Sequence, residues 1–197
     1  MTAEFIRLTT PLSAEDVARL CAGDRVLLSG AVYAARDTAH KRLVDLLERG
    51  EQLPFDPVGQ VIYYAGPSPT RPGQVIGSAG PTTSGRMDPY APALLRAGIR
   101  AMIGKGKRSP AVVEAMKKAG AVYFAVVGGA AALIARSVIA NEIVAFPELG
   151  PEAVRKLVLK DLAVFVANDA TGRDLYDEGA ARYRIPDPAT RNRKLET

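Results

Sequence analysis

Three positively charged side chains stand where strand-like segments give way to helix-like segments. They are Arg36, Arg86 and Lys105. In α/β proteins, ligands bind outside the carboxyl ends of the strands, where turns of this kind gather. An arginine can hold a carboxylate through two parallel hydrogen bonds, and a lysine adds a mobile point charge. The three cations therefore favour a small anionic ligand with two carboxylates.

The loop that contains Arg86 reads Gly80-Pro-Thr-Thr-Ser-Gly-Arg-Met-Asp88. Two glycines and a proline shape its backbone, and three consecutive hydroxyl residues precede the cation. Backbone N–H groups, hydroxyls and a guanidinium can bind an anion together. An ordinary polar turn has the same composition, and the pattern alone does not separate the two interpretations. The loop is not a nucleotide-binding P-loop, because the Gly-Lys-Ser/Thr ending is absent.

Arg36 and His40 belong to the segment Ala35-Arg-Asp-Thr-Ala-His40, at the start of an expected helix. The positive end of the helix dipole disfavours a second charge on His40. Spacing alone favours the simpler interpretation, in which Arg36 forms a surface ion pair and His40 is a core histidine with satisfied hydrogen bonds. Lys107 and Arg108, beyond Lys105, are interpreted as solvent-exposed cations of a basic loop.

The chain lacks a nucleophile–base pair and an obvious Lewis acid. It has one cysteine, Cys21, and one histidine. A disulfide framework is therefore impossible, and zinc or iron–sulfur sites need several converging ligands. Cys21 is interpreted as a small buried residue near the end of a short helix. The residues thus suggest half of an active site, with any cluster chemistry supplied by another chain.

Length and composition indicate an ordinary globular domain of 197 residues with 48% hydrophobic and 24% charged residues. The net charge is +5, and much of this excess lies in a basic segment, 181–197, that we expect to be loosely ordered. Without that segment the charge is nearly balanced, and no aromatic-rich basic stripe could stack bases, which argues against nucleic-acid binding. No apolar run matches a bilayer and no signal-peptide pattern opens the chain, so we predict a cytoplasmic protein.

Strand and helix patterns alternate through the middle of the chain. The expected strands are 5–8, 25–34, 61–65, 99–103, 121–127, 142–146, 155–160 and 163–168, the last two forming a hairpin. The expected helices are 13–23, 37–50, 88–98, 109–120 and 130–139, with Asp37 and Asp88 as caps of the second and third. This order predicts one α/β domain over residues 1–180 with a mixed sheet.

The same segments resemble the β subunit of class I fumarate hydratases and L-tartrate dehydratases, roughly over residues 25–169. The most specific match is Gly80–Asp88, which fits the family pattern GPTT-x-x-RMD. The other matching segments are Arg36–His40 (RD-x-AH), Gly104–Ser109 (KG-N-RS, with Lys107 at the asparagine), Tyr64–Pro67 and Phe146–Gly150.

The resemblance implies a swivelling β/β/α domain and a hydro-lyase that reversibly adds water to, or removes it from, a small dicarboxylate, fumarate/malate or tartrate/oxaloacetate. It implies a separate α subunit that carries a [4Fe–4S] cluster, in an α₂β₂ type of assembly. Arg36, Arg86 and Lys105 would contact the substrate carboxylates and Thr82 would transfer a proton at carbon, with Thr83 and His40 as supporting residues. The alternative is a non-catalytic dicarboxylate-binding or assembly module.

Overall fold

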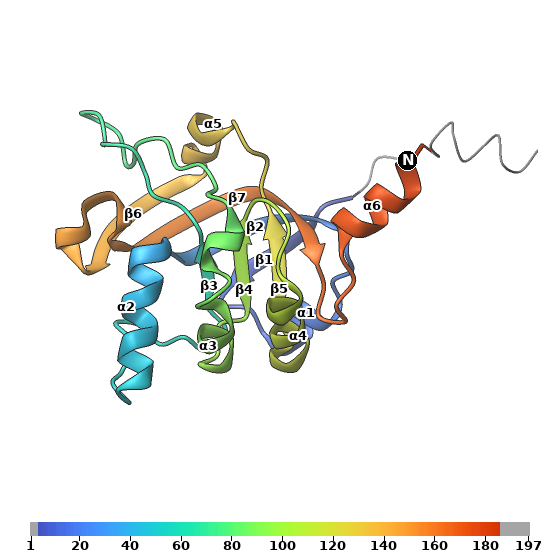
Figure 1. Cartoon of the computed structure of the whole chain (residues 1–197). Coiled ribbons are helices and arrows are strands. Elements are labelled where there is room, and N and C mark those ends of the chain that lie inside the picture. Colours follow the sequence, from blue (N-terminus) through green and yellow to red (C-terminus); the bar gives the residue numbers. More distant parts are fainter. Residues whose placement is uncertain (1–3, 186–197) are drawn as a thin grey trace, which may run out of the picture.

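The computed structural model describes residues 4–185, which form an α/β domain around one mixed sheet (Figure 1). The strands of this described part are β1 (Ile6–Thr10), β2 (Arg25–Ala34), β3 (Val61–Tyr63), β4 (Ala101–Gly104), β5 (Val122–Ala125), β6 (Val138–Ala145) and β7 (Val154–Asn168). The helices are α1 (Ala14–Ala18), α2 (Asp37–Glu48), α3 (Ala91–Arg96), α4 (Pro110–Ala119), α5 (Ala131–Ala135) and α6 (Leu175–Tyr183), with 3-10 turns η1 (Ser84–Met87) and η2 (Pro147–Glu152). The predicted fold class is confirmed.

The sheet curls into a ring because its last strand, β7, pairs with both β5 and β2. The order is β1-β2-β3-β4-β5-β7-β6, and β7 also pairs with β2. Strands β2, β3, β4 and β5 run parallel, whereas β7 is antiparallel to both β5 and β2. The carboxyl ends of β2, β3 and β4 therefore meet at one end of the ring.

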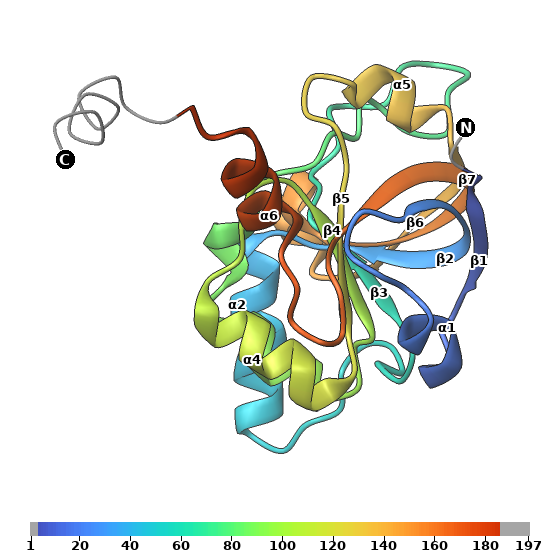
Figure 2. The ribbon, with the colours of Figure 1, turned by 90° about the vertical axis from the view of Figure 1, so that its right-hand side faces the viewer.

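Two hydrophobic cores lie on opposite faces of this sheet. Side chains alternate between the faces along each strand, so that in β3 Val61 and Tyr63 belong to one core and Ile62 to the other. The core that contains Ile62 is closed by α2, α3 and α4, which lie together on one side of the sheet (Figure 2). Every residue of β4 is buried, so the backbone that carries Lys105 leaves a rigid element.

Several predicted elements agree closely with the structure. Strand β2 has the predicted bounds, and α4 ends at Ala119, directly before Gly120, whose left-handed φ of 59° suits glycine. The predicted hairpin at 155–168 is wrong. Residues 154–168 form the single strand β7, which pairs with β2 from Arg155 to Phe165 and accommodates Asp161 at a φ of 50°. The hairpin partner of β7 is β6.

Both predicted aspartate caps are wrong. The residue that precedes α2 is Arg36, without a side-chain cap hydrogen bond, and the residue that precedes α3 is Tyr90. Cys21 is exposed, not buried. Helix α1 ends at Ala18, so Cys21 lies in a following turn, where its N–H donates to the Asp24 carboxylate at 2.8 Å.

The expected helix at 130–139 is shorter than predicted, because α5 ends at Ala135 and β6 begins at Val138. The predicted domain boundary at 180 falls within α6, and residues 186–197 of the predicted basic segment lie outside the described residues. Within residues 4–185, no helix has both the length and the apolar character needed to span a bilayer.

A candidate active site at the carboxyl ends of the parallel strands

The threonine loop and the lysine loop are joined by backbone hydrogen bonds. The N–H of Thr82 donates to the carbonyl of Tyr64 at 2.7 Å, just beyond β3. The N–H of Ser84 donates to the carbonyl of Lys105 at 2.9 Å, and the N–H of Lys105 donates to the carbonyl of Thr82 at 3.3 Å. Thr82, Thr83 and Lys105 are therefore neighbours, as the sequence predicts from their positions after parallel strands.

Arg36 and Arg86 meet through one carboxylate, that of Asp37. An Arg86 guanidinium N–H donates to Asp37 Oδ2, and Arg36 Nε lies 3.8 Å from Asp37 Oδ1. Arg36 Nη2 also lies 3.4 Å from Glu152 Oε1. The Arg86 side chain is half exposed, whereas Arg36 is more enclosed and packs against the backbone of Gly66. Both arginines are thus held in place by acidic side chains of the same chain.

Lys105 differs from the two arginines in its surroundings. It is exposed, and among residues 4–185 no aspartate or glutamate forms an ion pair with it. Gly128 lies beside it, since a Cβ on that glycine would be 3.6 Å from Lys105 Cδ. The ammonium group is therefore the cation of this site that is readiest to bind an incoming anion.

His40 is completely buried and anchors the backbone of Arg36. Its Nδ1 lies 2.8 Å from the carbonyl oxygen of Arg36, so Nδ1–H is the donor, and Tyr64 presents a ring edge-on at 5.2 Å. Burial, reinforced by the charge of Arg108, lowers the pKa of His40 from 6.5 to about 4. His40 is therefore a neutral support for Arg36, in line with the interpretation as a core histidine, although its Nε2 has no hydrogen-bond partner among the described residues.

The lowered pKa of His40 makes stability depend on pH. Because the imidazole binds a proton more readily in the unfolded chain, this contribution to stability is complete above pH 6.5 and is lost as pH falls towards 4. We expect the free energy of unfolding to fall by about 3 kcal/mol between pH 6.5 and pH 4 for this reason. His40→Asn keeps a donor near the Nδ1 position and removes the titration. Unfolding by urea should therefore show a smaller stability loss between pH 6.5 and 4 for His40→Asn than for the unsubstituted chain; equal losses would contradict this interpretation.

Arg108 is buried, and its interpretation as a solvent-exposed loop cation is wrong. Its exposed fraction is 2%. Nε donates to Asp88 Oδ1 at 2.9 Å and Nη1 donates to the Tyr64 hydroxyl at 3.0 Å. The guanidinium also lies over the rings of Tyr64 and Tyr123, at 5.1 Å from each centroid. These contacts compensate for the burial of its charge. Lys107 is exposed as expected and pairs with Asp177.

The Asp88–Arg108 pair helps to tie the threonine loop and the lysine loop to the sheet. The second Asp88 oxygen accepts from the N–H of Ser109 at 2.8 Å, so Asp88 serves the start of α4 and not α3.

Tyr123 of β5 forms a 2.8 Å hydrogen bond with the hydroxyl of Ser84 and donates to the carbonyl of Gly106 at 2.9 Å. Burial raises the pKa of Tyr123, so its phenol stays protonated. The hydroxyl of Tyr123 therefore holds both the loop that carries Thr82 and the loop that carries Lys105.

Gly104 has no room for a side chain in this arrangement. A Cβ there would lie 2.0 Å from Ser84 Oγ and 2.9 Å from Tyr64 Cδ2. We expect Gly104→Ala to cost about 1–3 kcal/mol of folding free energy, because the threonine loop must move. Gly85→Ala is the matched control, since a Cβ at Gly85 would meet nothing within 4 Å. Thermal unfolding of both variants checks this, and equal melting temperatures would show that the two loops are not tightly packed.

Sequence reasoning found the cations of this site but missed the groups that hold them. The missed residues are Asp37 and Asp88 in their observed roles, Tyr64, Tyr123, Arg108 and Glu152. Asp37 could have been suspected, since it directly follows Arg36 in the segment already singled out. Tyr123 and Glu152 gave no local signal, because strand pairing and loop packing bring them to the site from distant parts of the chain.

Comparison with known proteins shows which family the chain belongs to. Residues 1–179 match the family described as Fumarase C-terminus. Fumarate hydratase 2 of Leishmania major is 42% identical over 161 residues, which cover 81% of this chain and 28% of that protein. The aerobic class I fumarate hydratase of Salmonella typhimurium is 42% identical over 156 residues, 78% of this chain and 28% of that protein. A putative L(+)-tartrate dehydratase subunit beta of Methanocaldococcus jannaschii is 39% identical over 173 residues, 85% of this chain and 89% of that protein.

The chain belongs to the fumarase C-terminal family, a family of hydro-lyase components. The predicted resemblance is confirmed. The chain spans little more than a quarter of the length of the fumarate hydratases it matches, but most of the length of the tartrate dehydratase β subunit.

Proposed function

We propose that this chain is the β-type component of a hydro-lyase that reversibly adds water to a small dicarboxylate, or removes it, and that it works only with a second chain. Three observations support the proposal: Arg36 and Lys105 follow the parallel strands β2 and β4, Arg86 pairs with Asp37, and backbone hydrogen bonds join Thr82 to Lys105. Three cations within one site are more than one carboxylate needs, and two carboxylates use them fully.

Substrate binding would begin with exchange of carboxylates. One carboxylate of the substrate takes the place of Asp37 at Arg86, while Arg36 stays anchored through its carbonyl oxygen by His40 and through its guanidinium by Glu152. Lys105 holds the other carboxylate. Fixing both ends orients the carbon–carbon bond of the substrate, which is the main way in which positioning lowers a barrier.

Thr82 is the proposed proton-transfer residue at carbon. Its backbone is held on both sides by hydrogen bonds with the backbones of Tyr64 and Lys105, which gives the threonine a defined place in the loop. A threonine hydroxyl is a weak base by itself. A carboxylate from the second chain would receive or return the proton through this hydroxyl. Thr83 and Ser84 would keep the loop in place.

An iron–sulfur cluster does not fit the donors of this chain. Clusters need several cysteine thiolates, and the chain has only Cys21, which is exposed in the turn before β2. No group of three or more metal-ligating side chains lies together within residues 4–185. We therefore assign the proposed [4Fe–4S] cluster to the partner α-type chain. When bound there it would supply Lewis-acid chemistry for the hydroxyl that leaves or adds.

The partner in this proposal corresponds to the part of the fumarate hydratases that this chain does not match. The β-subunit name of the archaeal relative supports a two-chain assembly. An α₂β₂ assembly, movement of this domain as a swivelling lid and a cytoplasmic location are further parts of the proposal. The free thiol of Cys21 suits a reducing compartment.

A dicarboxylate-binding module without turnover is the rival function, because the same cations would serve it. Presenting fumarate, L-malate, tartrate and mesaconate separately to the anaerobically purified two-chain protein separates the two functions and identifies the substrate. Appearance of the hydrated or dehydrated product, detected by chromatography, is the result that the proposal expects. Saturable binding without any product would favour the binding module.

A further inference from the structure

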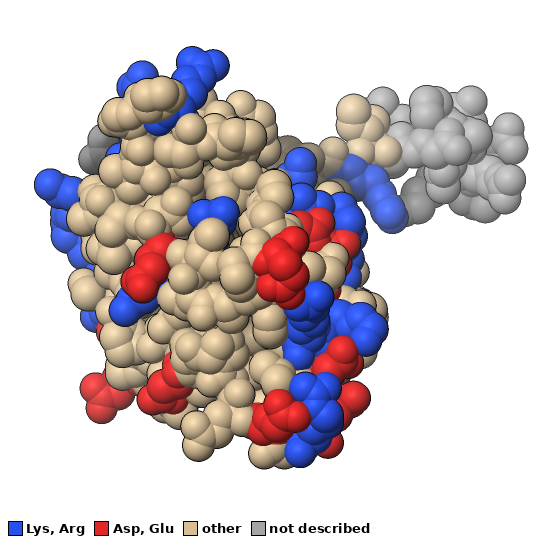
Figure 3. All heavy atoms as spheres, turned by 90° about the vertical axis from the view of Figure 1, so that its left-hand side faces the viewer, with Lys and Arg blue, Asp and Glu red and all other residues tan. Residues whose placement is uncertain are grey.

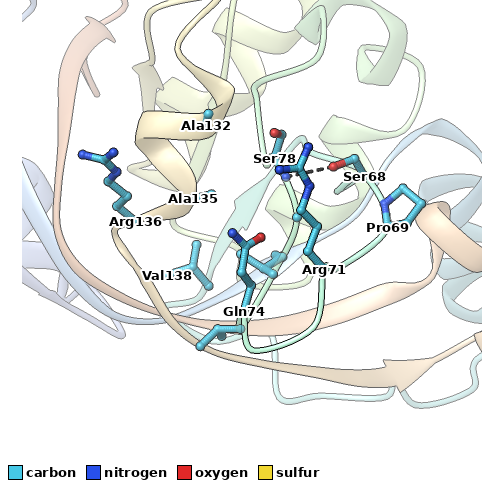
Figure 4. A pocket seen from close by; sticks show the side chains of 12 residues that line it. Ser68, Pro69, Arg71, Gln74, Ser78, Ala132, Ala135, Arg136 and Val138 are labelled. Atoms are coloured by element: carbon cyan, nitrogen blue, oxygen red, sulfur yellow. Dashed lines mark hydrogen bonds between the residues drawn. The ribbon is translucent and has the colours of Figure 1, made fainter.

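A cavity of about 460 Å³ opens beside the candidate active site. It lies between the loop 66–79 and helix α5 (Figure 4). Its walls combine cationic, amide and apolar side chains. Those used below are Arg71, Val75 and Arg136. A cavity of this size can receive one or two side chains of another protein.

The cavity carries positive charge that nothing in the described chain neutralises. Figure 4 shows Arg71 and Arg136 on opposite walls. Neither forms an ion pair within residues 4–185, and no aspartate or glutamate lines the cavity. The upper part of the face in Figure 3, over the loop 66–79, likewise shows Lys and Arg but no Asp or Glu. An anionic group is therefore the complementary occupant.

Large apolar side chains are exposed on the three elements that form the cavity walls, and Val75 lines the cavity itself. The exposed fractions are 64% for Leu133 on α5, 47% for Val75 on the loop and 53% for Ile139 on β6. Strand β6 is joined to the loop, since the Asn141 amide donates to the carbonyl of Val75 at 3.4 Å. Exposed aliphatic residues close to arginines are typical of protein–protein interfaces.

This surface is continuous with the candidate active site. Gly128 lies beside Lys105, and from there the chain runs directly into α5. The N–H of Ala79 donates to the carbonyl of Ala131 at 3.2 Å, three residues before Thr82. A protein that covers the end of the ring to complete the site would therefore also reach the cavity.

We propose that the loop 66–79, α5 and the start of β6 form a docking face for the partner chain, and that an acidic segment of the partner, flanked by apolar side chains, fills the cavity between Arg71 and Arg136. The inference rests on the proposed function, which supplies the partner. Charge complementarity, the exposed aliphatic rim and continuity with the site carry it. The length of the matching fumarate hydratases supports it, since most of each lies outside the region shared with this chain.

Binding of the purified α-type chain by calorimetry tests the docking face. The double variant Arg71→Glu/Arg136→Glu should weaken the complex by roughly 100-fold, because like charges then face each other. Arg96→Glu/Lys118→Glu is the charge-matched control, since these two cations are exposed on α3 and α4 at the other end of the molecule, and it should leave affinity unchanged. Leu133→Ser should also weaken binding, whereas Val58→Ser, at a residue of similar exposure, should not.

The possible failures can be told apart. Unchanged affinity of the double variant and of Leu133→Ser would overturn the docking face, while turnover by the same complexes would leave the proposed function standing. Self-association of the unsubstituted chain that the double variant abolishes would assign the face to a second copy and also overturn the inference. If the unsubstituted chain did not bind the α-type chain at all, the proposed function and the docking face would both be wrong.

Discussion

Arg108→Gln is expected to lower the free energy of unfolding by about 3–5 kcal/mol, the largest stability effect in this chain, because it removes one partner of a buried ion pair. Asp88 would keep its charge at the start of α4 without the guanidinium that now lies 2.9 Å away. The Tyr64 hydroxyl would lose its donor, and the space between the Tyr64 and Tyr123 rings would lose its cation. Urea unfolding at neutral pH measures this change.

Arg96→Gln is the control for Arg108→Gln, because it makes the same chemical change on an exposed residue of α3. Such surface changes are usually within about 0.5 kcal/mol of neutral. Similar small effects of both substitutions would show that Arg108 is not the buried link between the threonine loop and the lysine loop. A large effect of Arg108→Gln alone would confirm that the buried charge of Arg108 stabilises the fold around the candidate site.

Arg86→Ala is expected to reduce kcat/KM of the two-chain enzyme by about 10²–10³-fold, because one carboxylate of the substrate loses its guanidinium. Stability should change by less than about 1 kcal/mol, since the Arg86 side chain is half exposed and its pair with Asp37 is near the surface. Anaerobic steady-state kinetics and urea unfolding together measure the two effects.

Arg42→Ala is the matched control for Arg86→Ala. Arg42 is a partly exposed arginine of α2 whose ion-pair partner is Glu148 of η2 and not Asp37. It should leave both activity and stability almost unchanged. Full activity of Arg86→Ala would remove Arg86 from the substrate site. A loss of stability as large as that expected for Arg108→Gln would instead indicate a structural role.

Local patterns in the sequence predicted the elements that depend on local physics. The strand Arg25–Ala34 was readable from its run of β-favouring residues, and the end of α4 from Gly120, whose conformation suits glycine. The positions of Arg36, Thr82 and Lys105 after parallel strands followed from the same reasoning. The site was therefore predictable as far as it depends on strand ends and turns.

Long-range packing decided the features that could not be predicted. Arg108 follows Lys105 and Lys107 in a loop with two glycines, a composition typical of an exposed segment. Its burial depends instead on Tyr64, just after β3, and Tyr123 of β5. The predicted hairpin of strands 155–160 and 163–168 would need a turn at residues 161–162. These residues instead belong to β7, because β7 pairs with β2 on both sides of Asp161. Such outcomes are set by partners far away in the chain.

Hydration of fumarate by this chain alone, by the α-type chain alone and by the two together tests the central claim most directly. The measurement follows the loss of ultraviolet absorbance under anaerobic conditions, after cluster reconstitution. We expect activity only when both chains are present, because the proposal assigns the dicarboxylate-binding cations to this chain and the remaining chemistry to its partner. Equal activity of the α-type chain with and without this chain would contradict the account.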